Sequence, residues 1–176
     1  MKYRRCFLPG GTFFFTVVTY NRNIIFHNPE TVTLLRDAFQ YVLDRHPFQI
    51  DACVILPDHI HTIWTLPEND SDYAMRWRLL KSHFTSRFEL KQSALSASRK
   101  IKKEQAVWQR RYWEHLIRDE EDLMRHVEYI HYNPVKHGLT DATFHWPYSS
   151  FHQYVRNGLY PSDWAMTERC EIAVAE

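Results

Sequence analysis

Two histidines, His59 and His61, stand two residues apart in the segment LPDHIHTIW. On a strand, such residues point to the same face, so the two imidazoles would lie side by side while Ile60 points to the opposite layer. Neutral imidazoles bind divalent metals, which makes the pair a candidate metal clamp. Because the chain has 11 histidines, a pair of this kind also arises by chance. A metal site therefore needs a further ligand from elsewhere in the chain.

A tyrosine in the second half of the chain, Tyr129, is the candidate nucleophile. The segment 120–133 has helical periodicity, and its predicted buried stripe comprises Leu123, Val127 and Ile130. At about 100° per residue, one flank of that stripe carries His126, Tyr129 and Asn133. Tyr132 falls on the opposite side, so helix geometry favours Tyr129 over its neighbour. An ordinary tyrosine at the rim of a helix is the alternative interpretation.

The elements that must position these residues follow from periodicity and from turn and cap signals. We expect strands at 12–20, 48–56, 59–66 and 113–118, and helices at 29–45, 73–90, 119–134 and 148–155. The buried side of the second helix is predicted to be Leu79, Leu80, Phe84 and Phe88. This order predicts an α+β fold with a ferredoxin-like or RRM-like antiparallel sheet and strand 12–20 near its centre. Two helices would cover one face and the tyrosine helix the other.

The composition is that of a folded globular chain, with 44% apolar and 24% charged residues in 176, enough to bury a core. We expect one domain over 1–176, with a flexible loop at 93–105 and a C-terminal tail at 144–176. Three cysteines without a Cys-x-x-Cys pair predict neither a disulfide framework nor a zinc knuckle. No apolar run of about 18 residues occurs, and the cytoplasm is the expected location.

Three segments, LPDHIHTIW, WQRRYWEHLIRDEEDLMRHVEYIHYNPVKHGL and WPYSSFHQYV, resemble in order and spacing the REP-associated tyrosine transposases of bacteria. These are IS200-like members of the HUH single-tyrosine superfamily. The resemblance covers nearly the whole chain, and only 93–105 is untypical. It implies that His59 and His61 are metal ligands, Asn133 the third ligand and Tyr129 the nucleophile.

The same resemblance implies an enzyme, a DNA nuclease and strand transferase that acts on single-stranded DNA beside the hairpins of REP elements. Cleavage would form a 5′-phosphotyrosine and a free 3′-hydroxyl, and rejoining would reverse it. The divalent metal would be Mg²⁺ or Mn²⁺, although imidazoles alone favour zinc. We expect a monomer, with a dimer as the alternative, associated with the nucleoid and with no membrane partner.

Contacts to DNA must come from local charge, because the formal net charge is only +1. The candidate contacts are Lys2, Arg4, Arg5, Arg78, Lys81 and Lys136. For each one, an ordinary solvated side chain is the alternative. His126 is a candidate accessory residue, and the base that takes the phenol proton is left open.

Two other functions fit parts of the sequence. A non-catalytic RRM-like module would bind single-stranded nucleic acid through aromatic and basic side chains without any covalent step. A zinc metallohydrolase would use His59 and His61 to activate water, which would make Tyr129 dispensable.

Overall fold

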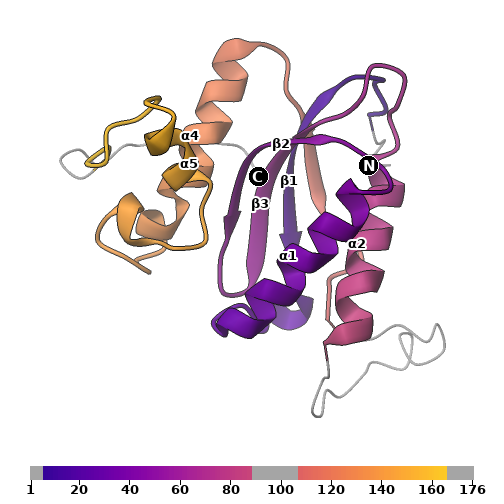
Figure 1. Ribbon diagram of the computed structural model, residues 1–176, viewed down its shortest axis with the longest axis horizontal. Helices are drawn as coiled ribbons and strands as arrows, with labels where there is room; N and C mark the ends of the chain where they lie inside the picture. Colours follow the sequence, from indigo (N-terminus) through magenta and orange to yellow (C-terminus); the bar gives the residue numbers. More distant parts are fainter. Residues whose placement is uncertain (1–5, 89–106, 166–176) are drawn as a thin grey trace.

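The computed structural model describes residues 6–88 and 107–165, which form an α+β fold around one antiparallel sheet (Figure 1). The strands are β1 (Thr12–Val18), β2 (Gln49–Ile55), β3 (His59–Thr65) and β4 (Trp113–Leu116). Their order is β2-β3-β1-β4, with every neighbouring pair antiparallel. The predicted fold class and the central place of the first strand are confirmed.

Helices cover both faces of the sheet. Figure 1 shows α1 (Pro29–Leu43) and α2 (Tyr73–Arg87) across one face, with α4 (Glu120–Lys136) and α5 (Phe151–Arg156) on the other side. Short 3-10 turns lie at η1 (Tyr20–Arg22) and η2 (Thr143–His145). In the part of the chain that is described, no helix has the length and apolar character needed to cross a bilayer.

Alternation along β1 divides the hydrophobic core into two layers. Phe13 and Phe15 point into the layer formed with α1 and α2, whereas Phe14 points into the layer under α4. The second layer also receives Val127 and Ile130 from α4, which packs against β2 and β3. The sheet face under α4 is therefore closed by a helix rather than left open to solvent.

The helix that carries Tyr129 is longer than predicted, since α4 continues past Pro134 to Lys136. A proline has no N–H to donate to the carbonyl four residues earlier, so α4 continues past Pro134 with one backbone hydrogen bond fewer. Two residues beyond the end of α4, Gly138 has a φ of 66°, the left-handed conformation typical of a glycine that follows the C-cap of a helix. The backbone N–H of Gly138 donates to the carbonyl of Val135.

The buried side of α2 also differs from the prediction. Leu79 and Phe88 are only partly buried, and Arg76 and Trp77 lie in the interior instead. A buried guanidinium is acceptable when its donors are satisfied. Those of Arg76 donate to the carboxylate of Asp70 and to the carbonyls of His46, Pro47 and Asp72.

The segment before α5 extends the sheet rather than the helix, so α5 begins at Phe151 and not at 148. The N–H of Ile55 donates to the carbonyl of Tyr148, and the N–H of Ser150 donates to the carbonyl of Cys53. The predicted loop at 93–105 and the last part of the predicted tail, 166–176, lie outside the described residues.

The C-terminal segment is also tied to α4 through a buried histidine. The Nε2 of His131 lies 2.9 Å from Oγ of Ser150. Burial lowers the pKa of His131 to about 3, so the ring is neutral in the folded protein at neutral pH. The unfolded chain takes up a proton at its ordinary pKa, which the folded protein cannot do.

We therefore expect His131 to make stability depend on pH. The free energy of unfolding should fall as pH drops below about 6.5, by about 1.4 kcal/mol per pH unit for this group, until its folded pKa is reached. Urea unfolding gives the free energy of unfolding at pH 7.5 and at pH 5.0. Between these two pH values, it should fall by about 2 kcal/mol less in His131→Gln than in the wild type. His27→Gln, at an exposed histidine, is the control. An unchanged pH dependence in His131→Gln would contradict this assignment.

Candidate active site

The sheet face under α4 carries the histidine pair. In the ladder between β1 and β3, His61 pairs with Thr16 and His59 with Val18. Alternation along β3 sends both histidines toward α4 and Ile60 into the opposite layer. The rings of His59 and His61 lie with centroids 4.8 Å apart and nearly perpendicular, and the two residues are only 5% and 1% exposed.

Each of these imidazoles is held by a partner at Nδ1. The Nδ1–H of His59 donates to the carboxylate of Asp58, which also pairs with Arg22 at 3.1 Å. The Nδ1 of His61 lies 2.9 Å from Oγ1 of Thr16. Partners of this kind orient histidines that bind metals through the other nitrogen. In both rings, Nε2 is therefore the nitrogen that can coordinate a metal.

The protonation states suit metal binding. Burial lowers the pKa of His59, against the opposing effect of Asp58, and burial lowers the pKa of His61 well below its usual value. Burial alone would raise the pKa of Asp58, but the hydrogen bond from His59 and the Arg22 ion pair keep it below its usual value. Two neutral imidazoles beside a carboxylate are the forms that a metal requires.

The phenol of Tyr129 reaches this pair from the helix. Its ring centroid lies 5.3 Å from that of His61 and 6.0 Å from that of Phe14, and the residue is 2% exposed. The ammonium of Lys136 lies 4.6 Å from the centre of the Tyr129 ring. Tyr132 is half-buried, and its ring makes no contact with the histidine pair in the described part of the chain. The structure thus brings His59, His61 and Tyr129 into one cluster from two separate elements.

Asn133 lies one helical turn beyond Tyr129 and is fully buried. Neither Nδ2 nor Oδ1 of this amide has a hydrogen-bond partner within residues 6–88 and 107–165. Buried polar atoms are normally paired, so an amide left in this state calls for a ligand or an ion. Two imidazole nitrogens and an amide oxygen are donors that suit a divalent metal and leave coordination positions open.

The other predicted residues are more scattered. Arg78 is exposed on α2, and Lys81 donates from the same helix to the carbonyl of Gln109. That helix covers the face opposite to the histidine pair (Figure 1), so neither residue meets the cluster. Of the remaining candidates, Lys136 lies at the cluster, and His126 lies one turn before Tyr129. Those in the N-terminal arm, Lys2, Arg4 and Arg5, are outside the described residues.

Three neighbours of the cluster were not predicted: Asp58, Thr16 and His137. The ring of His137 lies 5.3 Å from that of His59. Asp58 precedes His59 directly in the sequence, so it could have been predicted as a hydrogen-bond partner of that ring. After Pro57, however, an aspartate is also typical of a turn. Thr16 depends on the register between β1 and β3, which no local pattern reveals.

A hollow of about 550 Å³ lies elsewhere, between α1, the edge strand β2 and the segment around α5. Its polar lining includes Arg36, Gln40, Gln153 and Asn157. Neither histidine of the pair nor Tyr129 is among the described residues that line it. The hollow is therefore separate from the residues that could do chemistry.

Comparison with known proteins identifies the family of the chain. The family described as "Transposase IS200 like" matches residues 12–133. A REP-associated tyrosine transposase of Escherichia coli (strain K12) is 44% identical over 164 residues, which cover 93% of this chain and 90% of that protein. A Haemophilus influenzae protein named as a candidate of the same kind is 44% identical over 163 residues, 93% of this chain and 92% of its own.

A solved structure of a REP-associated tyrosine transposase bound to a REP hairpin has the same fold, with a TM-score of 0.78 and 41% sequence identity. The match covers 96% of this chain and 94% of that one. The match to the family spans both the histidine pair and the helix with Tyr129 and Asn133. The chain therefore belongs to the IS200-like transposase family and is an enzyme that acts on DNA.

Proposed function

We propose that this transposase cleaves and rejoins single-stranded DNA beside REP-type hairpins through a 5′-phosphotyrosine at Tyr129. The observation that carries the proposal is the approach of the Tyr129 ring to within 5.3 Å of His61, next to a histidine pair oriented by Asp58 and Thr16. The substrate class is supported by the similar structure, whose protein is bound to a REP hairpin.

A divalent cation, Mg²⁺ or Mn²⁺, would be held by His59, His61 and Asn133. When bound, such a cation neutralises and orients the anionic oxygens of a phosphodiester. The protein contributes the orientation of its ligands. Asp58 and Thr16 fix the two rings, and burial keeps both of them neutral.

The chemical step is an attack by the Tyr129 oxygen on phosphorus. A new oxygen–phosphorus bond forms, and the bond between phosphorus and the 3′-oxygen breaks. The phenol loses its proton, and the departing 3′-oxygen gains one to become a hydroxyl. Because the phosphotyrosine preserves a phosphodiester-like bond, a 3′-hydroxyl can attack it in the reverse direction and rejoin the strand.

Positive charge lies where it would help this step. The Lys136 ammonium lies 4.6 Å from the centre of the Tyr129 ring, and a positive charge there favours negative charge on the attacking phenol. Lys136 is exposed, so it can also contact a DNA phosphate that enters the site. The imidazole of His137 is on the same side, beside His59.

The nucleophile can be tested by trapping. Tyr129→Phe should abolish a covalent adduct between the protein and a labelled REP hairpin in Mn²⁺, because the attacking oxygen is gone, while binding in a mobility-shift assay is kept. Tyr132→Phe, which removes the neighbouring phenol of the same helix, is the matched control and should form the adduct. Loss of the adduct in Tyr132→Phe alone would overturn the assignment. Binding by the wild type without any adduct would favour a non-catalytic module.

The partner of His59 can be tested through metal dependence. Asp58→Asn should raise the Mn²⁺ concentration for half-maximal adduct formation by about 10- to 100-fold, since it weakens the hydrogen bond that orients a ligand. Asp141→Asn is the matched control, because Asp141 also accepts from Nδ1 of a histidine, but at the surface. An unchanged Mn²⁺ requirement in Asp58→Asn would show that this hydrogen bond does not prepare a metal ligand.

We propose that the site functions within one chain, because His59, His61 and Tyr129 meet without a second copy. An equimolar mixture of Tyr129→Phe and His61→Ala should then form no more adduct than the two variants do separately. Recovery of adduct in the mixture would indicate that chains exchange their tyrosine helices. Adduct formation by the wild type alone is the positive control.

A further inference from the structure

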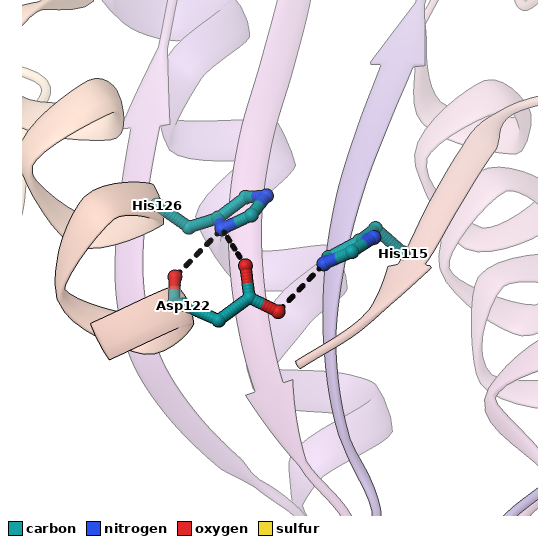
Figure 2. A group of neighbouring side chains, drawn as sticks. All are labelled: His115, Asp122 and His126. Atoms are coloured by element: carbon teal, nitrogen blue, oxygen red, sulfur yellow. Dashed lines mark hydrogen bonds and ion pairs between the residues drawn. The ribbon is translucent and has the colours of Figure 1, made fainter. Parts of the chain in front are cut away.

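A second cluster of metal-binding side chains lies at the start of α4. Figure 2 shows the Asp122 carboxylate joined to the rings of His115, from β4, and His126, from α4, which stack with their centroids 4.7 Å apart. The Nε2 of His115 lies 2.8 Å from Oδ2 of Asp122, and the Nδ1 of His126 lies 3.2 Å from Oδ1. One potential ligand atom from each residue lies within 4.8 Å of the others.

This cluster is distinct from the pair formed by His59 and His61. The ring of Phe14 lies between them, with its centroid 5.5 Å from that of His61 and 4.9 Å from that of His126. Phe14 pairs with His115 on one neighbouring strand and with Ile63, two residues beyond His61, on the other. The two groups of histidines therefore occupy opposite sides of one buried aromatic ring.

The ligand set favours a transition metal. Two imidazoles and one carboxylate, with a fourth position left for water, form a recurrent zinc site. Bonds to zinc from nitrogen or oxygen are about 2.0–2.2 Å, so two ligand atoms of a tetrahedral site lie about 3.4 Å apart. The present ligand atoms are separated by up to 4.8 Å, so the side chains would have to close by up to about 1.4 Å.

The local charge also admits a cation. The positive end of a helix dipole opposes cations at its first turn, but the first turn of α4 carries Glu120, Glu121 and Asp122. Arg118 is the competing cation, with Nε 3.6 Å from Oδ2 of Asp122. Its side chain is 72% exposed, so it can move into solvent without leaving a buried cavity.

We infer that His115, Asp122 and His126 form a second metal site, which takes Zn²⁺ or a similar transition-metal ion. Binding would place the proton of each neutral ring on the nitrogen that faces away from Asp122. The Nδ1 of His126 would give up its hydrogen bond to the Asp122 carbonyl, now 2.7 Å long. The ion would join β4 to the first turn of the helix that carries Tyr129.

The test is metal binding by full-length protein stripped with a chelator, in a His59→Ala/His61→Ala double variant that lacks the first pair. Calorimetric titration with Zn²⁺ should give one bound equivalent, and Co²⁺ should give visible absorption of a nitrogen- and oxygen-ligated ion. Adding His115→Gln should weaken Zn²⁺ binding more than about tenfold, in line with the loss of one ligand. His145→Gln, at an exposed histidine that pairs with Asp141, is the matched control and should leave binding unchanged.

Circular dichroism will show whether each variant is folded, and His126→Gln replaces His115→Gln if the latter is not. Failure of the double variant to bind Zn²⁺ or Co²⁺ would overturn the inference, as would binding that survives both His115→Gln and His126→Gln. Because no DNA is used, the outcome is independent of whether Tyr129 forms a phosphotyrosine.

Discussion

The packing of α4 onto the histidine-bearing face of the sheet is the interaction on which the site depends. Val127 and Ile130 bury their side chains against Phe14 and Ile63, and burial of such side chains contributes roughly 1.5–3 kcal/mol each. Residues about one turn apart share a helix face. The contact that buries these apolar side chains therefore also places Tyr129 against β3. A shift of α4 by one turn would move the phenol by about 5 Å and separate it from His61.

The chemistry also requires polar groups to be buried in that interface. An unpaired imidazole or amide in such a place costs about 1–3 kcal/mol. The fold offsets this cost for His59 and His61 through Asp58 and Thr16, whereas no residue in the described part of the chain does so for Asn133. A bound cation would satisfy the amide oxygen, so stability and metal binding are linked at this position.

Much of this arrangement was accessible from sequence because it rests on short-range periodicity. Strand alternation predicted that His59 and His61 share a face, and the α+β architecture followed from the order of the elements. Tertiary contacts decided the rest. Only the register of β1 against β3 brings Thr16 to His61, and the interior position of Arg76 depends on carbonyls about 30 residues away. The end of α4 is a different case, because Gly138 is a local stop signal beyond Pro134, whereas the prediction ended the helix at the proline.

The backbone pairing of Tyr148 and Ser150 with β2 has a consequence for solubility. A strand at the border of a sheet exposes unpaired N–H and C=O groups, which invite strands of other molecules to add and start aggregation. Here residues 53–55 at the end of β2 pair with the chain's own segment 148–150, and the opposite border, β4, has only four residues. These features reduce the number of unpaired backbone N–H and C=O groups that each border offers to a strand of another molecule. The sheet of this transposase is thus protected from pairing with copies of itself.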